Sequence, residues 1–385
     1  MFNILHLTTF LHAGAGNVIT TLAEAQVHMK FQVIVAGNDK EEPGFGYNHY
    51  QRHIETLTTL GISFYRTDST FKRDLGLNLQ AAAFVRTLID KHQITLIHAH
   101  AAIPALVGSL ARSGQKRYIP IVQTAHGWGQ NKTPEHEFMD VVIMNGLDHI
   151  VAVSQGEKDL LAAKGVRAEN ISVIYNGASE TVQSNFDNPL IREIKELKES
   201  GFFVIGCVGS ICERKNQALL LKAFSQLSAR RKTVLILIGE EEEPLTSRLK
   251  QEAKDLHIAR LVKFYGYQPH ADMLTGFFDC FVLPSKSEGL GISAIEAFRA
   301  QVPVVLSNIP PFQELVTDQK TGFLFESENA ASLLKVLEMV IDLPAEQRKH
   351  LTHQAYQLFL STFTTDAMIK NYMAVYNKLP LCRQF

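Results

Sequence analysis

The feature that most constrains the fold is an alternation of short apolar segments with segments of helical length. It runs through the first half of the chain and starts again after residue 200. The apolar segments are residues 4–8, 32–36, 95–97, 120–122 and 149–153 in the first half, and 202–208 at the start of the second series. Strands that alternate with helices are typical of α/β proteins, so the pattern predicts a doubly wound parallel sheet in each half.

The chain is too long for one hydrophobic core. It has 385 residues, of which 46% are hydrophobic and 20% are charged, so two domains are expected. Around residues 181–200 the alternation gives way to a polar stretch and then to a charged segment of helical character. We predict that residues 181–200 link the two domains.

Charge and cysteine content bear on partners and location. The 38 Lys and Arg residues balance 39 Asp and Glu residues, so electrostatics give no reason to expect a nucleic-acid partner. The 4 cysteines lack the paired spacing of metal sites, which fits a reducing compartment. The first residues lack the pattern of a secretory signal, and no stretch of about 18 apolar residues occurs, so we expect a cytoplasmic protein.

The segment Phe281–Phe298 predicts a strand, a turn and a helix. It begins as an apolar run, breaks at Gly289 and Gly291, and continues with helix-forming residues. In open parallel sheets ligands bind beyond the carboxyl ends of the strands, where the free N–H groups of a helix N-terminus can receive phosphate oxygens. We therefore expect the backbone of this turn to approach a phosphate group.

Two carboxylates flank this turn, Glu288 before the helix and Glu296 within it. A carboxylate can accept two hydrogen bonds from the vicinal hydroxyls of a sugar or ribose. The alternative is that Glu288 only caps the helix and Glu296 is a solvated helix residue. Spacing alone leaves both interpretations open.

A second phosphate-binding candidate follows the strand at residues 202–208. Arg214 and Lys215 stand after a loop that begins at Gly209, at the start of the next helix. Cations beside a helix N-terminus suit a diphosphate. The alternative, a solvated pair on the first turn, is disfavoured because basic residues there oppose the helix dipole.

The first half has a glycine pair in the corresponding place. Gly14 and Gly16 lie in residues 11–17, which we expect to be a loop between the first strand and a helix that starts at Asn17. Ile19 stands where a dinucleotide-binding Gly-x-Gly-x-x-Gly motif would have its third glycine. The motif therefore gives little support to nicotinamide binding.

Three histidines of the first half are candidates for a site. His98 and His100 point to the same side of a strand, which raises a metal-site interpretation, but no Cys or carboxylate nearby completes four ligands. Lining a cleft is the favoured role. His126 follows the strand 120–124, at the end where catalytic residues concentrate, although it could serve packing alone.

Together these motifs make the chain resemble glycosyltransferase family 4, over almost its whole length. The matching pieces are His98-Ala99-His100, Thr124-Ala125-His126-Gly127, Val153-Ser154, Ile174-Tyr175-Asn176-Gly177, Gly209-x4-Arg214-Lys215-Asn216-Gln217, Val262–Gly266, Asp279–Ser285, Glu288-x7-Glu296, Pro303-Val304-Val305 and Gly322.

The resemblance implies a GT-B fold, in which two Rossmann-like doubly wound domains face each other across a cleft. Residues 1–180 would form the acceptor-side domain and residues 201–360 the nucleotide-sugar-binding domain. Residues 361–385 would form a C-terminal helix that crosses back to the first domain, with residues 365–372 packed on it.

The resemblance also implies roles for residues. Glu288 would contact the donor sugar, Glu296 the ribose, and Arg214 and Lys215 the diphosphate, while His126 would contact the transferred sugar near its reacting carbon. The donor-binding residues expected in all are Gly14, Gly16, Gly209, Arg214, Lys215, Gly289, Leu290, Gly291 and Glu296, and the catalytic ones His126 and Glu288.

The implied function is that of a retaining hexosyltransferase that uses a nucleotide-diphosphate sugar, by default a UDP-sugar. The acceptor would be a glycan or a lipid-linked glycan in the synthesis of cell-surface polysaccharide or glycolipid, with peripheral contact at the inner membrane face left open. No cofactor or metal is expected, since the chain has no Asp-x-Asp motif. The alternative is a GT-B protein of another use, a nucleotide-sugar epimerase or a non-catalytic binder.

Overall fold

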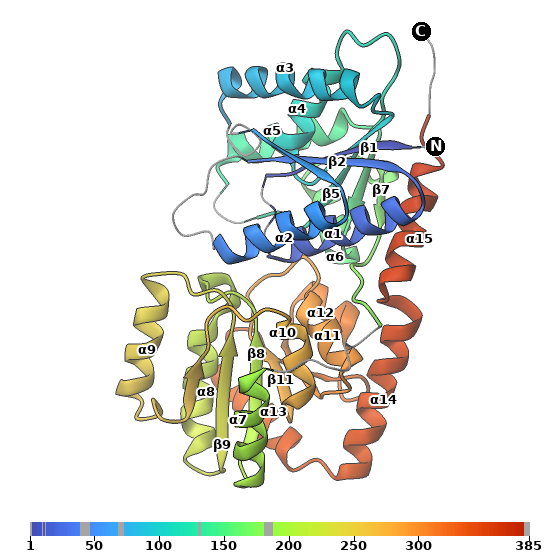
Figure 1. The fold of residues 1–385 in the computed structure, drawn as a ribbon. Coiled ribbons are helices and arrows are strands. Elements are labelled where there is room, and N and C mark those ends of the chain that lie inside the picture. The colour runs from blue at the N-terminus through green and yellow to red at the C-terminus, as the bar shows by residue number, and fades with distance from the viewer. Residues whose placement is uncertain are drawn as a thin grey trace. The chain divides into compact units, whose positions relative to one another are not determined.

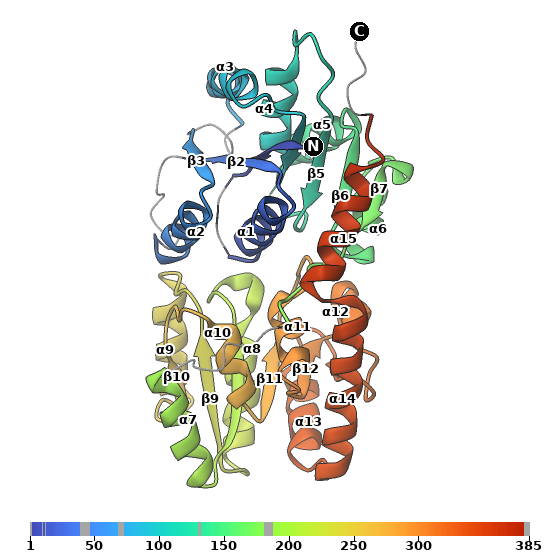
Figure 2. The ribbon, with the colours of Figure 1, turned by 45° about the vertical axis from the view of Figure 1, so that its right-hand side comes forward.

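The computed structural model describes residues 2–9, 11, 13–38, 47–67, 73–129, 132–180 and 188–380, with only the backbone at 13 and 47–49. The chain forms two compact units (Figures 1 and 2). Unit 1 comprises the residues up to Asn176 together with those from Met368 onward, and unit 2 comprises Gly177–Ala367.

Unit 1 is built on a parallel sheet of seven strands in the order β3-β2-β1-β4-β5-β6-β7. The strands are β1 (Asn3–Leu7), β2 (Gln32–Gly37), β3 (Ser63–Arg66), β4 (Leu96–Ala99), β5 (Ile121–Ala125), β6 (His149–Ala152) and β7 (Ile171–Val173). The five strands that the apolar segments predict occupy the inner positions of the sheet. The two outermost strands, β3 and β7, were not among the predicted segments, and β3 has no fully buried residue that would mark it as apolar.

Helices cover both faces of this sheet, which is why most residues of its five inner strands are buried. They are α1 (Ala13–His28), α2 (Tyr47–Thr59), α3 (Leu75–Lys91), α4 (Ala102–Arg112), α5 (Pro134–Asn145) and α6 (Gln155–Ala163). Along β2, Val33 and Val35 join the core beneath α1 and α2, whereas Ile34 and Ala36 join the core beneath α3 and α4. This period of two is the one expected for a strand that is buried on both sides.

Unit 2 has a parallel sheet of six strands in the order β10-β9-β8-β11-β12-β13. The strands are β8 (Phe203–Val208), β9 (Thr233–Ile238), β10 (Val262–Phe264), β11 (Cys280–Leu283), β12 (Val304–Ser307) and β13 (Phe323–Phe325). The helices are α7 (Pro189–Glu199), α8 (Gln217–Ser228), α9 (Leu245–Asp255), α10 (Ala271–Leu274), α11 (Ile292–Arg299), α12 (Pro310–Leu315), α13 (Ala330–Ile341) and α14 (Ala345–Thr362). Two doubly wound parallel sheets are therefore present, as the alternation predicts.

The segment expected to be a linker is in part a helix of unit 2. Residues 188–200 contain α7, which begins at the Asn188 cap and contacts β8. Residues 181–187 lie outside the described residues. The amphipathic pattern of α7, with Leu190 and Ile194 buried, explains why it packs on the sheet.

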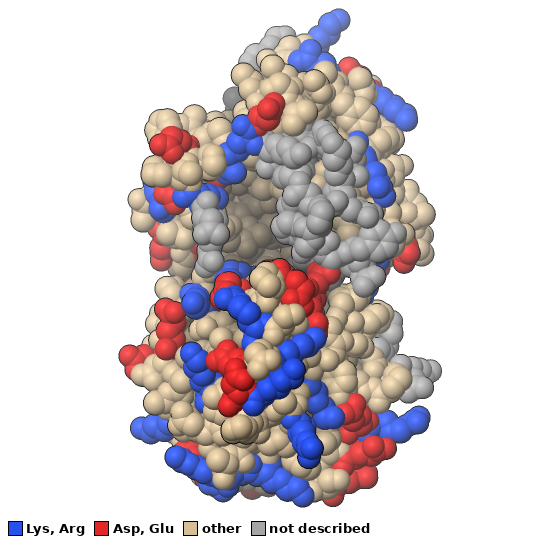
Figure 3. Space-filling model, turned by 90° about the vertical axis from the view of Figure 1, so that its left-hand side faces the viewer, with Lys and Arg blue, Asp and Glu red and all other residues tan. Residues whose placement is uncertain are grey.

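The C-terminal helix α15 (Thr365–Tyr376) brings its residues from Met368 onward into unit 1. Tyr372 and Tyr376 are fully buried there, and the Tyr372 hydroxyl lies 3.0 Å from the hydroxyl of Thr124 on β5. No helix in the described part of the chain is long and apolar enough to span a membrane. Basic and acidic side chains are interspersed on the face shown in Figure 3.

Candidate functional site

The turn after β11 has the predicted order of strand, turn and helix. Gly291 caps the N-terminus of α11 with a φ of 101°, in the left-handed region that favours glycine. A Cβ atom at this position would lie 2.6 Å from Cε1 of Phe312, so a side chain would also clash. The backbone of residues 289–291 therefore leads directly into a helix N-terminus, where the first N–H groups have no partner within the helix.

Glu288 lies at the centre of a compact charged cluster. One of its carboxylate oxygens is 2.7 Å from Nζ of Lys215, and the other is 2.7 Å from a guanidinium nitrogen of Arg214. The hydroxyl of Ser285 donates a further hydrogen bond of 2.8 Å to the carboxylate. The side chains of Glu288 and Lys215 are only 8% and 10% exposed, whereas that of Arg214 is 38% exposed.

These partners decide the charge of Glu288. Burial of the carboxyl opposes ionisation, but Lys215 and Arg214 outweigh that effect and lower the pKa of Glu288 to about 2. Glu288 is therefore a carboxylate at neutral pH and the cluster carries two positive charges and one negative. An anion would meet two cations there, of which Arg214 also feels the charge of Glu242.

Gly209 makes room for the lysine of this cluster. Its φ is 152°, and a Cβ atom would lie 3.1 Å from Cε of Lys215. The structure thus unites Gly209, Arg214, Lys215 and Glu288, which the sequence analysis selected from separate motifs. Glu296 lies half-buried on α11, one turn inside the helix as expected.

The prediction that residues 11–17 form a loop is wrong from Ala13 onward. Helix α1 begins at Ala13, so Gly14 and Gly16 lie in its first turn. A Cβ atom at Gly16 would lie 2.6 Å from Nε2 of His53, which shows that this glycine allows close packing of α1 on its neighbours. Glycine disfavours helix by about 1 kcal/mol relative to Ala, and tertiary packing overrides that preference here.

In unit 1, His126 follows β5 as predicted and lines a pocket of about 260 Å³. Its lining residues include His100, Trp128, Lys132, Asp140 and Glu157. Nε2 of His126 is 3.0 Å from Nδ1 of His100. Burial lowers the pKa of His126 to about 4, so the ring is neutral at physiological pH.

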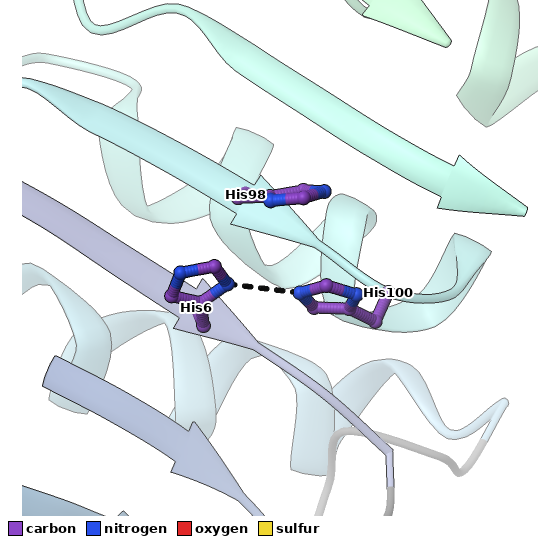
Figure 4. A group of neighbouring side chains, drawn as sticks. All are labelled: His6, His98 and His100. Atoms are coloured by element: carbon purple, nitrogen blue, oxygen red, sulfur yellow. Dashed lines mark hydrogen bonds between the residues drawn. The ribbon is translucent and has the colours of Figure 1, made fainter. Parts of the chain in front are cut away.

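A third histidine, His6, lies beside His98 and His100, and no motif in the sequence marks it. The parallel register of β1 and β4 pairs His6 with His98, and one ring nitrogen from each of His6, His98 and His100 lies within 4.8 Å of the others (Figure 4). Three imidazoles so close together could hold a transition metal. Every one of their ring nitrogens, however, already lies within hydrogen-bond distance of a protein group.

Glu157 is another residue of the pocket that no sequence motif predicts. It occupies the first turn of α6 after the Ser154 cap, and its side-chain oxygen Oε1 has no hydrogen-bond partner in the described part of the chain. Burial raises the pKa of Glu157 to about 7, although Lys132 and a backbone N–H act against this rise. The carboxyl is therefore half protonated near neutral pH.

This pKa predicts how the stability of unit 1 depends on pH. A carboxyl with a raised pKa stabilises the fold below the unfolded value of about 4.5, and this contribution is lost as the pH rises to about 7. Glu157→Gln should remove this loss and stabilise unit 1 at pH 8 by at most about 3 kcal/mol. The single tryptophan, Trp128, lies in unit 1, so its fluorescence in urea titrations at pH 5 and pH 8 measures the effect. An equal effect at both pH values would contradict the assignment.

Two protein-family models match the chain. The one described as "Glycosyltransferase Family 4" matches residues 12–181, and the one described as "Glycosyl transferases group 1" matches residues 190–358. The first covers most of unit 1 and the second most of unit 2.

Several curated proteins are similar in sequence. The chain is 23% identical over 305 residues to N-acetyl-alpha-D-glucosaminyl L-malate synthase of Bacillus anthracis, across 78% of each chain. It is 23% identical over 320 residues to the capsular polysaccharide biosynthesis glycosyltransferase CapM of Staphylococcus aureus, across 80% of this chain and 83% of CapM.

Solved structures share the fold at low sequence identity. The Anabaena protein HepE in complex with UDP-glucose has a TM-score of 0.83 and 21% identity, across 98% of this chain and 99% of that chain. A glycosyltransferase from Rickettsia africae has a TM-score of 0.83 and 19% identity, across 98% of each chain.

Proposed function

The chain belongs to glycosyltransferase family 4 and has the GT-B fold, and from this premise we propose that it is a retaining, nucleotide-sugar-dependent hexosyltransferase. We propose a UDP-sugar as donor and a glycan or lipid-linked glycan as acceptor, in the synthesis of cell-surface polysaccharide or glycolipid. The similarity to CapM, which is named for capsular polysaccharide biosynthesis, supports the choice of pathway. The similarity to HepE, whose structure was solved in complex with UDP-glucose, supports the choice of donor. The reaction would take place in the cytoplasm, with peripheral membrane contact where the acceptor is lipid-linked.

The observation that carries this proposal is the cluster of Glu288, Lys215 and Arg214 beside the N-terminus of α11. A diphosphate would bind Arg214 and Lys215 through charge-assisted hydrogen bonds and receive further N–H groups from residues 289–291. Glu288 would then be free to accept hydrogen bonds from the hydroxyls of the donor sugar. Glu296, farther along α11, would do the same for the ribose.

In the proposed reaction the acceptor hydroxyl attacks the anomeric carbon on the face from which the diphosphate departs. The bond between that carbon and the phosphate oxygen breaks, a bond to the acceptor oxygen forms, and the acceptor proton passes to the departing phosphate. No protein nucleophile is required, and the anomeric configuration is retained. Arg214, Lys215 and the N–H groups of α11 would stabilise the charge that develops on the leaving group.

A donor panel tests the proposal. We expect calorimetric titration with UDP-, GDP- and ADP-sugars to show binding of a UDP-sugar, and NMR to show its transfer or slow hydrolysis with retained configuration at the anomeric carbon. Glu288→Gln keeps the size of the side chain but removes the charge that pairs with Lys215 and Arg214, so we expect it to lower the rate of transfer. Formation of a 2-epimer without transfer would identify an epimerase instead, and binding without any reaction would identify a non-catalytic binder.

The proposed donor site also predicts independence of metal. Two cations and a helix N-terminus would stabilise the charge on the leaving diphosphate, as a divalent ion does in metal-dependent enzymes. Turnover should therefore persist in excess EDTA. Initial rates with EDTA, with magnesium and with manganese provide the measurement. Complete loss of turnover in EDTA, restored by either ion, would contradict this prediction.

A further inference from the structure

A chain of hydrogen bonds runs from helix α1 to the pocket of unit 1. The side-chain oxygen of Gln26 lies 2.8 Å from Nε2 of His6, Nδ1 of His6 lies 2.9 Å from Nε2 of His100, and Nδ1 of His100 lies 3.0 Å from Nε2 of His126. Figure 4 shows the bond between His6 and His100. Gln26, His6 and His100 are 1%, 0% and 6% exposed, so water has little access to these hydrogen bonds.

Burial keeps these rings neutral. It lowers the pKa of His6 to about 4, although the bond to Gln26 acts against it. Burial also lowers the pKa of His126 to about 4 and the pKa of His100 well below its usual value. A neutral imidazole has one N–H donor and one acceptor nitrogen, so a bond at one nitrogen fixes the role of the other.

The donor and acceptor roles along this row of hydrogen bonds follow from Gln26. The carbonyl oxygen of Gln26 can only accept, so Nε2 of His6 carries the proton and Nδ1 of His6 accepts. Nε2 of His100 must then donate, and Nδ1 of His100 must accept from Nε2 of His126. The proton of His126 therefore lies on Nε2, and its Nδ1 is left as an acceptor.

A second branch is compatible with this orientation of the Gln26 amide. Its nitrogen donates to the hydroxyl of Tyr376 at 3.4 Å, and that hydroxyl donates to Nδ1 of His98 at 2.7 Å. Nε2 of His98 then donates to Thr124, whose hydroxyl lies 3.0 Å from that of Tyr372. Every group in both branches has a consistent role as donor or acceptor.

The same bonds weigh against a metal ion among His6, His98 and His100. Coordination would take a lone pair from each ring, and it would break bonds that now satisfy buried polar groups. An unsatisfied buried donor or acceptor is costly. The hydrogen-bonded chain thus accounts for the three clustered histidines without a metal.

We propose that Gln26, His6 and His100 are positioning residues that fix His126 in the tautomer whose Nδ1 accepts a hydrogen bond from a hydroxyl of the transferred sugar. The proposal deepens the function proposed above and depends on it for the presence of the sugar. His126 lines the pocket, and its Nδ1 has no partner among the described residues. A sugar hydroxyl can donate to this nitrogen, whereas fluorine in the same position cannot.

The tautomer can be measured without any substrate. Isotope-labelled histidine and proton–nitrogen correlation spectra report which ring nitrogen carries the proton, and His126→Ala assigns the His126 signal. We expect the proton on Nε2 of His126 in the wild-type protein. A proton on Nδ1 would overturn the inference, and so would tight binding of Zn²⁺ that shifts the signals of His6, His98 and His100.

Two substitutions test whether Gln26 fixes the tautomer of His126. Gln26→Met removes both polar atoms at similar volume, and we expect His126 to become a mixture of tautomers. Gln26→Glu keeps an oxygen that accepts from His6, and we expect it to restore the proton on Nε2. Circular dichroism and Trp128 fluorescence check that each variant is folded, and an unchanged tautomer in folded Gln26→Met would contradict the role of Gln26.

Fluorinated donors test the contact with sugar. Among donors with one hydroxyl replaced by fluorine, we expect one to lose about five- to tenfold in kcat/KM with the wild-type enzyme but not with His126→Ala. Equal losses in both proteins would overturn the sugar contact even if the tautomer is correct. If no donor reacts, the proposed function fails, and the tautomer spectra still decide the direction of the hydrogen-bond chain.

Discussion

Lys215→Ala should weaken the binding of the nucleoside diphosphate by roughly 1.5–3 kcal/mol, which is the value of a charge-assisted hydrogen bond. The side chain of Lys215 is nearly buried and lies 2.7 Å from Glu288. A bound diphosphate would therefore form an ion pair with a cation that is almost shielded from water. Arg214→Ala should have a smaller effect, because its side chain is more exposed and solvent screens its charge. Calorimetric titration with UDP measures both affinities.

Lys286→Ala is a matched control for this prediction. Lys286 lies two residues before Glu288, but its side chain is 42% exposed and faces Glu328 at 3.4 Å. Its loss removes the same charge from the neighbouring loop, which carries Glu288, and should leave the affinity for UDP unchanged. Equal affinities for UDP in Lys215→Ala, Arg214→Ala and the wild-type protein would mean that the phosphates bind elsewhere.

Lys215→Ala should also weaken the contribution of the Glu288 carboxylate to the stability of the fold. Without Lys215 the carboxylate keeps Arg214 as its ionic partner among the described residues, and the burial that opposes its charge is less well compensated. Because the pKa of Glu288 is lowered in the wild-type fold, its stabilising effect is present above the unfolded value of about 4.5 and is lost as the pH falls toward 2. The variant should therefore lose part of this stabilising effect at neutral pH.

The strand pattern was predictable where strands are buried on both faces. Residues 204–208 of β8 are buried, and a continuous apolar run marks such a strand in the sequence. The edge strands β3 and β7 are short and partly exposed, so they give no such signal. The parallel topology followed from the helices between strands rather than from any single strand.

Helix boundaries were harder to predict, as α1 shows. Its start at Ala13 places two glycines inside a helix, against their intrinsic preference. One reason is the close approach of Gly16 to His53, which is 37 residues farther along the chain. Local propensity does not contain such information.

The candidate site was predictable only as separate parts. Glu288, Arg214 and Lys215 each came from a local motif, but the ion pairs between them depend on the packing of the two loops that follow β8 and β11, which are adjacent strands. Gln26 and Tyr376 gave no signal at all, because the chain of buried hydrogen bonds joins elements that are 350 residues apart. The neighbouring strands β1 and β4 could have indicated His6, since their parallel register places it beside His98.

His126→Ala should lower kcat by roughly 10²-fold or more and change donor affinity little, because the proposed contact acts mainly on the sugar as its bond to the diphosphate breaks. At that stage the anomeric carbon becomes positively charged, and a positioned ring with a neighbouring backbone carbonyl would stabilise it. The pKa of about 4 makes His126 neutral above pH 5, so it should not act as a general acid. The kcat of the wild-type enzyme should accordingly show no change between pH 6 and pH 8 that disappears in the variant.

The control for this prediction is His28→Ala, which removes an exposed histidine from the end of α1. It should leave kcat unchanged, so that a loss in His126→Ala alone reflects the position of the ring in the pocket. The anomeric configuration of the product completes the test, since the same geometry requires retention. A His126→Ala variant with wild-type kcat would mean that the sugar reacts without the contact to His126, and the role of the buried hydrogen-bond chain in catalysis would fall with it. A product of inverted configuration by NMR would rule out the proposed attack on the face from which the diphosphate departs.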